Sequence, residues 1–196
     1  MKPVCLVLGA GAGIGGTVAT RFAQEGYHSS LCRRSDKEGL DRLVNNIKDQ
    51  GGSANGYIMN AIEDNAIEEV ITSIESDIGP IEVLVYNLGA QTGMKLLEQT
   101  SHKEFEWGWR MASFGLFRAA KILCPLMVER GKGTFLVTSA TAAMRGNRNQ
   151  HSHAAAMAAR RMLCQSLNAE FSPQGIHITH IVVDGAVDAP APSTTI

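Results

Sequence analysis

The chain has 196 residues, with 18 lysines and arginines, 19 aspartates and glutamates, and a formal net charge of −1. A chain of this length is typical of one domain that buries about 70% of its unfolded surface, so it needs no disulfide or metal staples. The charges are scattered without a basic run, which argues against a nucleic-acid partner and against binding to a charged membrane surface.

The cysteines form no CxxC pair and no metal-ligand spacing, so we expect reduced residues in or near the core and no metal site. They are Cys5, Cys32, Cys124 and Cys164. The apolar N-terminus resembles a signal peptide, but the five glycines from Gly9 to Gly16 argue against that reading. No segment is expected to be long enough to span a bilayer. These features predict a soluble, cytoplasmic protein without a membrane partner.

Short apolar runs alternate with helical patterns along the whole chain. Several runs are apolar at every position, as in parallel strands that helices cover on both faces. The expected strands are Val4–Leu8, His28–Cys32, Ala54–Met59, Val83–Tyr86, Thr134–Thr138 and His177–Val183. The repeated β-α order with right-handed crossovers predicts a single α/β domain, a Rossmann-type doubly wound parallel sheet with three αβα layers.

Helical patterns fill the intervals between these strands. Two capping boxes, Ser35-x-x-Glu38 and Ser101-x-x-Glu104, each predict a helix start. Longer helices are expected over Ser101–Glu129 and Gln150–Phe171. The tail from Ala189 carries no pattern and is expected to be loop or disorder. Isoleucines and a valine at helical spacing predict one buried stripe, formed by Ile67, Val70, Ile71, Ile74 and Ile78.

A glycine-rich turn follows the first strand and opens a helix expected over Ile14–Glu25. A helix that starts after such a turn presents free amides and the positive end of its dipole to an anion. Glycine lets a pyrophosphate approach the backbone more closely than a Cβ would allow. A tight turn without a ligand is the alternative, but the position in a βαβ unit favours dinucleotide binding. The turn residues are Gly9, Gly11, Gly13, Ile14 and Gly15.

We expect the strand order 3-2-1-4-5-6, with this turn at the carboxyl edge of the sheet where the order reverses.

The spacing of Gly9, Gly13 and Gly15 resembles the short-chain dehydrogenase/reductase family more than the long-chain dehydrogenases. Later segments resemble the same family in order and spacing, namely Ile81–Ala90, Gly133–Ser139 and Leu163–Ile178. The resemblance covers residues 1–189 and implies an NAD(P)-dependent oxidoreductase that transfers hydride to or from a carbonyl or alcohol. Residues 190–196 are expected to be a tail that lacks the family's substrate lid and last strand.

The family resemblance also implies which residues bind the cofactor. The end of the second strand selects it, and this chain has Arg33 and Arg34 there without an acid. Guanidinium groups suit phosphate, so NADP(H) is favoured over NAD(H); two solvated surface arginines are the alternative. The other implied contacts are Asn60 at the adenine, Asn87 and Gly89 at its ribose, and Gly185 and Val187 on the nicotinamide side.

This chain resembles the family at one of the four positions that carry its acid-base chemistry. Ser139 retains the serine, whereas Ala112 stands for the asparagine, His153 for the tyrosine and Met157 for the lysine. Methionine carries no charge and alanine cannot hold a water chain. Histidine can donate a proton, because its pKa of about 6.5 suits neutral pH. The candidate catalytic residues are therefore Ser139 and His153.

Other readings of His153 stay open. A lone histidine beside apolar residues is more often a filler or a polar surface residue. A shifted alignment would place Ser152 or His151 there, but neither restores a tyrosine, and no Tyr-x-x-x-Lys occurs in the chain. The tyrosines are expected to lie in or beside early strands, far from this helix: Tyr27, Tyr57 and Tyr86.

Three hypotheses follow for function. The first is an NADP-dependent oxidoreductase with a degenerate, weak or atypical site and an unknown small carbonyl or alcohol substrate. The second is a non-catalytic dinucleotide-binding sensor or oligomeric partner, and the third a structural remnant with an empty cleft. A homodimer or homotetramer is expected, because both long helices correspond to those that pair between subunits in the family. Aromatic residues mark the first of them: Trp107, Trp109, Phe114 and Phe117.

Overall fold

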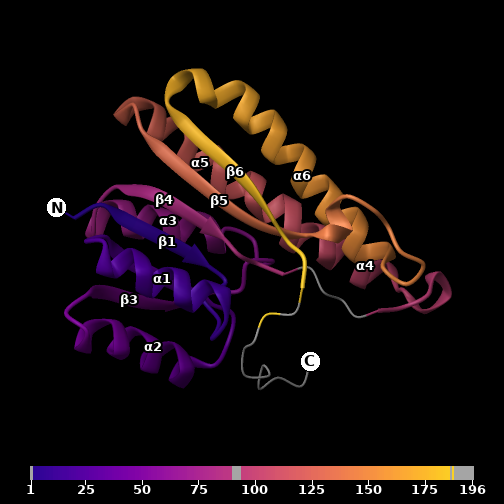
Figure 1. Cartoon of the computed structure of the whole chain (residues 1–196), viewed down its shortest axis with the longest axis horizontal. Coiled ribbons are helices and arrows are strands. Elements are labelled where there is room, and N and C mark those ends of the chain that lie inside the picture. Colours follow the sequence, from indigo (N-terminus) through magenta and orange to yellow (C-terminus); the bar gives the residue numbers. More distant parts are fainter. Residues whose placement is uncertain (1, 90–93, 186, 188–196) are drawn as a thin grey trace.

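The computed structural model describes residues 2–89, 94–185 and 187. It contains one six-stranded parallel sheet in the order β3-β2-β1-β4-β5-β6, with helices on both faces (Figure 1). The predicted Rossmann-type architecture and strand order are confirmed. The strands are β1 Val4–Leu8, β2 His28–Arg33, β3 Ser53–Ile58, β4 Ile81–Tyr86, β5 Gly133–Ala140 and β6 Ile176–Val183. The helices are α1 Ile14–Gln24, α2 Lys37–Asp49, α3 Ala66–Asp77, α4 His102–Trp109, α5 Gly115–Arg130 and α6 His151–Phe171.

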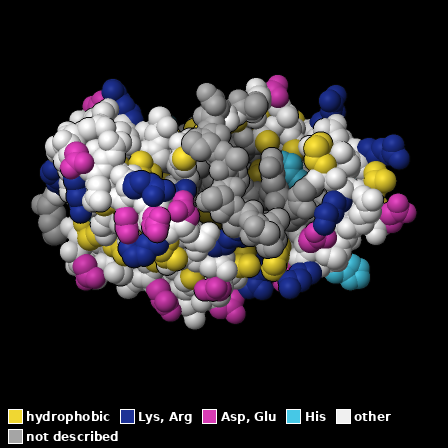
Figure 2. Space-filling model, turned by 90° about the horizontal axis from the view of Figure 1, so that it is seen from below, with side chains coloured by type: hydrophobic (Ala, Val, Ile, Leu, Met, Phe, Trp, Pro, Cys, Tyr) yellow, Lys and Arg dark blue, Asp and Glu magenta, His cyan; other side chains and the backbone are white. Residues whose placement is uncertain are grey.

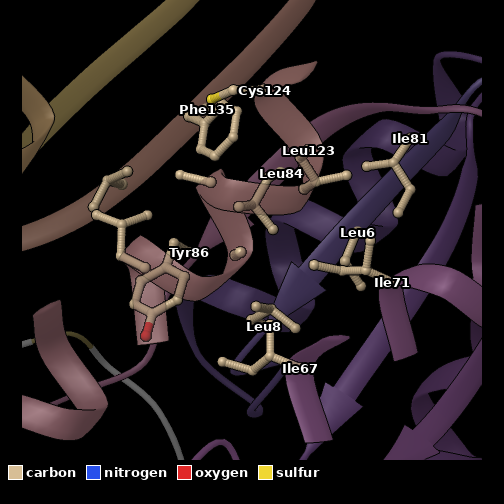
Figure 3. Packing of buried hydrophobic residues seen from close by; sticks show 14 of the residues in the cluster. Leu6, Leu8, Ile67, Ile71, Ile81, Leu84, Tyr86, Leu123, Cys124 and Phe135 are labelled. Carbon is tan, nitrogen blue, oxygen red and sulfur yellow. The ribbon is translucent and has the colours of Figure 1, made fainter. Parts of the chain in front are cut away.

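Two apolar cores cover the two faces of the sheet. Every residue of β1 is buried, which explains its unbroken apolar run. Helices α1 and α2 cover one face, where Leu40, Val44 and Ile47 of α2 join the core. Helices α3, α5 and α6 contribute to the other core. Figure 3 shows Ile67 and Ile71 of α3 and Leu123 of α5 packed around side chains of the central strands. The four cysteines are buried and unpaired, as predicted.

The glycine turn lies directly against the end of β4. Gly9 has φ +95°, and an added Cβ would lie 2.7 Å from the carbonyl oxygen of Asn87. The Asn87 amide donates to the Gly9 carbonyl oxygen over 2.9 Å and accepts from the Thr138 hydroxyl over 2.8 Å. One side chain therefore joins the ends of β1, β4 and β5 at the point where the strand order reverses.

The first predicted capping box is wrong. The residue that caps α2 is Asp36, whose carboxylate accepts from the amide of Gly39 over 2.9 Å. Asp36 has φ +60°, a conformation that Asp tolerates better than most side chains, and it also pairs with Arg33. The box at Ser101 and Glu104 is confirmed by reciprocal bonds between the side chains and backbone amides.

The long helix predicted over Ser101–Glu129 contains an irregular turn. Its α-helical hydrogen bonding changes to π-helical bonding over Arg110–Phe114, between α4 and α5. Such turns widen the helix locally and re-aim the backbone groups around them. The expectation that no segment is long enough to span a bilayer is also wrong. By length and composition His102–Arg130 passes that test, but 56% of its apolar window is buried inside the fold, as in the core helix of a soluble protein.

Charged side chains of both signs are interspersed on the face of the molecule shown in Figure 2. Five of the ten ion pairs among the described residues join side chains three or four positions apart, such as Lys37 with Asp41. A nucleic-acid site would instead gather lysines and arginines along one face. The absence of a nucleic-acid partner stays a prediction.

The glycines of the turn predict a test of this geometry. An added Cβ at Gly15 collides with the carbonyl oxygen of Gly9, whereas at Gly11 it meets nothing within 4 Å. We expect Gly15→Ala to lower the free energy of unfolding by about 1–3 kcal/mol, and Gly11→Ala to change it by less than about 0.5 kcal/mol. Urea unfolding of both variants is the measurement. Equal losses would show that the close approach of Gly15 to the Gly9 carbonyl does not fix the turn.

Candidate active site

Two cavities lie at the carboxyl edge of the sheet. The Arg34 cavity, of about 40 Å³, is lined by Gly9, Arg34, Asn60 and neighbouring side chains at the ends of β2, β3 and β4. The Ser139 cavity, of about 230 Å³, is lined from β4, β5, α6 and the start of α1. Its residues are Ile14, Asn87, Leu88, Gly89, Thr138, Ser139, Ala140, His153, Met157, Arg160 and Val183. The structure thus gathers sequence-predicted residues into two groups.

The two arginines after β2 have different surroundings. The Arg33 guanidinium pairs with the Asp36 carboxylate over 3.0 Å and is only 18% exposed. Arg34 is exposed and lines the Arg34 cavity together with Asn60. The side-chain nitrogen of Asn60 donates to the Glu63 carboxylate over 3.0 Å, and the side-chain oxygen takes no part in that bond. Of the two predicted phosphate contacts, Arg34 is therefore the one whose side chain borders a cavity.

The residues predicted for the chemistry meet in the Ser139 cavity. Ser139 lies inside β5, one residue before its end, and its hydroxyl lies 3.7 Å from the sulfur of Met157. His153 is 8% exposed and lines the same cavity from the first turn of α6. A methionine sulfur is a weak acceptor and no donor, so the serine hydroxyl has no cationic neighbour at this position.

Ala112 lies beside this cavity without lining it. It is fully buried in the π-helical turn and packs with Ala142, Ala143, Ala156 and Met157. A methyl group at this position fills space and cannot hold water. The turn is linked to the cavity through the Ala112 carbonyl oxygen, which accepts a hydrogen bond from Arg160 in the cavity wall.

The predicted nicotinamide-side loop is only partly described. Gly185, with φ +147°, and Val187 are exposed after the end of β6 and line neither cavity. Ala186 and residues 188–189 lie outside the described residues, as does the predicted tail. The structure thus places these two residues near the carboxyl end of β6 and adds no contact for them.

Sequence reasoning missed Arg160, a fully buried residue that lines the Ser139 cavity. Its guanidinium donates to the carbonyl oxygens of Ala112 over 2.8 Å, Thr138 over 2.6 Å and Leu88 over 2.6 Å. The signal was available: Arg160 follows Met157 by one helical turn, on the apolar face of α6. A charged residue at that spacing is buried only when it has partners.

The expectation that the tyrosines lie far from the long helix is wrong for Tyr86. The Arg160 guanidinium of α6 lies 5.1 Å from the centroid of the Tyr86 ring. Tyr86 is fully buried and its hydroxyl donates to the carbonyl oxygen of Met111 over 2.5 Å. Burial raises the pKa of this hydroxyl, although Arg160 and Arg118 act against the shift. Tyr86 therefore lies beside α6, but its hydroxyl is neutral and donates to a backbone carbonyl, so it is not placed to act as an acid or base.

A larger hollow, of about 540 Å³, lies between α3 and α5. Its lining includes Phe114, Phe117 and Arg118, and it shares no residue with the glycine turn or with Ser139. Size alone does not select it as the site, because it brings together no nucleophile, histidine or glycine-rich backbone.

The residues at the carboxyl edge fit a dinucleotide. The N-cap of α1 is Gly13, which has no side chain, and the first turn of α1 carries no acid. The Gly16 amide donates to the carbonyl oxygen of Gly11 over 2.9 Å, so the amides that face an anion at this end are those of Ile14 and Gly15. Gly11 leaves open space where another residue would place a Cβ. The Arg34 cavity lies on one side of this turn and the Ser139 cavity on the other, as an extended ligand with two ends requires.

Comparison with known proteins identifies the family of this chain. A family model described as short chain dehydrogenase matches residues 3–193. The 3-oxoacyl-(acyl-carrier-protein) reductase FabG of Thermotoga maritima is 28% identical over 187 residues, which are 95% of this chain and 75% of that protein. The 2,3-dihydro-2,3-dihydroxybenzoate dehydrogenase of Bacillus subtilis is 27% identical over 185 residues, covering 94% of this chain and 70% of that protein.

Solved structures of short-chain dehydrogenases are similar to this chain in fold and sequence. A short-chain dehydrogenase from Sphingobium yanoikuyae in complex with NADPH matches with a TM-score of 0.85 and 28% identity, over 93% of this chain and 71% of that one. One from Rhodopseudomonas palustris matches with the same TM-score and identity, over 92% and 84%. The chain therefore belongs to the short-chain dehydrogenase family and is a homologue of NAD(P)-dependent oxidoreductases.

Proposed function

We propose that this protein binds NADP(H) along the carboxyl edge of its sheet and is an oxidoreductase homologue with weak or atypical hydride-transfer activity. The observation that carries the proposal is the placement of the two cavities on either side of the glycine turn. Arg34 stands where the 2′-phosphate would be recognised, and Ser139 with His153 stand in the other cavity. Gly9, Gly11, Gly13, Ile14 and Gly15 would hold the pyrophosphate.

The chemistry proposed for this site follows from its side chains. The nicotinamide, when bound, supplies or accepts the hydride. The Ser139 hydroxyl would donate a hydrogen bond to the oxygen of a small ketone or alcohol, and His153 would hold the proton that this oxygen gains or loses. Met157 provides no charge to tune a neighbouring acid and no donor for ribose hydroxyls. We therefore propose that the protein binds the cofactor but turns over slowly.

Cofactor selection gives the first prediction of this proposal. Arg34 is exposed and borders a cavity, whereas Arg33 is paired with Asp36. We expect Arg34→Ala to weaken NADPH binding by about 10–100-fold while NADH binding changes little, because a charge-assisted hydrogen bond contributes about 1.5–3 kcal/mol. Arg33→Ala is the matched control and should change NADPH affinity much less. Calorimetric titration of both cofactors is the measurement; equal affinities for NADPH and NADH in all three proteins would contradict the proposal.

The chemical half gives the second prediction. We expect the double variant His153→Tyr, Met157→Lys to reduce ketones with NADPH about 10²–10⁴-fold faster than the unmodified protein, the usual contribution of a positioned acid. Either single change should do little, because the tyrosine needs the ammonium group to lower its pKa and the lysine needs the tyrosine to transfer the proton. Steady-state NADPH oxidation over a panel of ketones is the measurement.

The same assay decides whether His153 acts in the unmodified protein. If it is the proton donor, NADPH oxidation should depend on it and His153→Ala should abolish the rate. Strong activity in the unmodified protein that survives His153→Ala would contradict the proposal, since no other acid in the Ser139 cavity is assigned that role.

We also propose that the protein forms a homodimer or homotetramer through the helix of α4 and α5. Trp109, Phe114 and Phe117 form a stacked series there, with centroid separations of 5.1 and 6.3 Å. Trp109 is 43% and Phe117 45% exposed, so the series presents apolar area to solvent in a single chain. A second copy of the chain is the proposed occupant, because the same face on two copies can pack symmetrically.

Light scattering tests this interface. At micromolar concentration we expect the unmodified protein to have at least twice the mass of one chain, and Phe117→Asp to shift it to the monomer, because a carboxylate cannot be buried unpaired. Ile58→Asp is the control, since Ile58 is 48% exposed on β3 at the other side of the sheet. An unmodified protein that is already monomeric would remove the proposal.

A cytoplasmic location is a further proposal. The four cysteines are buried and unpaired, and burial raises the pKa of the Cys124 and Cys164 thiols to about 11. Thiols in this state suit a reducing compartment, where disulfides are rare.

A further inference from the structure

Arg160 is a fully buried cation whose partners are backbone carbonyl groups. Its three bonds reach the segment after β4 at Leu88, the strand β5 at Thr138 and the π-helical turn at Ala112. Leu88 and Thr138 line the Ser139 cavity, and Ala112 packs against Met157 beside it. Thr138 is the residue before Ser139, so the guanidinium also fixes the backbone beside the serine hydroxyl.

No carboxylate of the described residues forms an ion pair with Arg160. Arg118, the other arginine that is nearly buried, differs in this respect because it pairs with Glu68. Burial lowers the pKa of the Arg160 guanidinium, but arginine stays protonated in proteins, so Arg160 keeps its charge. Carbonyl dipoles and the face of Tyr86 stabilise that charge without cancelling it.

The position of this charge matters for the cavity. Arg160 lines the Ser139 cavity, and one turn earlier on the same helix stands Met157, which has no charge. Each terminal nitrogen of the guanidinium carries two N–H groups. One nitrogen uses one of its N–H groups to bond to Thr138, and the other uses one to bond to Leu88. The cavity that holds Ser139 and His153 therefore has a fixed positive charge in its wall.

We propose that the positive charge of Arg160 makes the Ser139 cavity bind the uncharged, reduced nicotinamide ring in preference to the positively charged, oxidised ring. The inference rests on the proposed dinucleotide function and deepens it. The same charge would stabilise a negative oxygen that develops on a carbonyl beside Ser139, so the site would favour reduction over oxidation.

Affinity for the two redox forms measures this charge directly, without any turnover. We expect the unmodified protein to bind NADPH on the order of tenfold more tightly than NADP⁺, the effect of two unit charges about 10 Å apart at an effective dielectric constant of about 20. 2′,5′-ADP, which has no nicotinamide, reports the adenosine end alone. Calorimetric titration with all three compounds is the measurement.

Variants separate the charge from the fold. Arg160→Met removes the charge at similar length and should bring the NADP⁺ to NADPH ratio of dissociation constants close to one, with 2′,5′-ADP affinity unchanged. Arg160→Lys keeps the charge and should keep the ratio. Arg161→Met is the matched control, because it loses the same charge one residue further along α6 and makes none of the three carbonyl bonds. If Arg160→Met does not fold, Arg160→Gln replaces it, since its amide can donate to a carbonyl without charge.

Each outcome decides the inference. A ratio that falls in the neutral variant and stays in Arg160→Lys and Arg161→Met supports it. An unmodified protein without preference for NADPH overturns it, and so does a ratio that persists in a neutral variant that still binds 2′,5′-ADP; both results leave the proposed cofactor site standing. If none of the three compounds binds the unmodified protein, the proposed function fails and the inference fails with it.

Discussion

The close contact between Gly9 and Asn87 is the constraint on which the site depends. The backbone of the turn approaches the end of β4 so closely that no Cβ fits between them, and the Asn87 amide closes the gap by bonding to Gly9 and Thr138. Because β1 is the strand at which the order reverses, this contact opens a crevice at the carboxyl edge. The two cavities lie on either side of it, and their contents decide what the protein does.

The sheet and the position of the glycine turn were predictable because their signals are local. An unbroken apolar run in β1, a glycine turn after it and a helix beyond are dictated by burial and by backbone conformation within twenty residues of sequence. The cap of α2 was missed because two neighbouring residues, Ser35 and Asp36, compete for one role, and the pairing of Asp36 with Arg33 decides between them. β4 begins at Ile81, two residues before the predicted Val83, because Ile81 also pairs with Val4 across a register shift between β1 and β4.

The chemical half was only partly predictable, because its contacts join residues far apart in the sequence. The spacing predicts His153 and Met157 at the positions of the family's tyrosine and lysine. The position of Arg160 relative to Leu88, Ala112 and Thr138 could not be predicted in this way, because it depends on four separate elements. The nearness of Tyr86 to α6 arises from the same packing. We propose that Met157 stands where the family has a lysine, and that the buried Arg160, one helical turn later, carries the positive charge instead.

The central claim is that one dinucleotide spans both cavities across the glycine turn. The measurement that tests it most directly is a crystal structure of the protein with NADPH bound. The account predicts the adenosine and its phosphate in the Arg34 cavity, the pyrophosphate at the start of α1 and the nicotinamide in the Ser139 cavity. A nucleotide bound in the hollow between α3 and α5, or a nicotinamide that lies outside the Ser139 cavity, would contradict it.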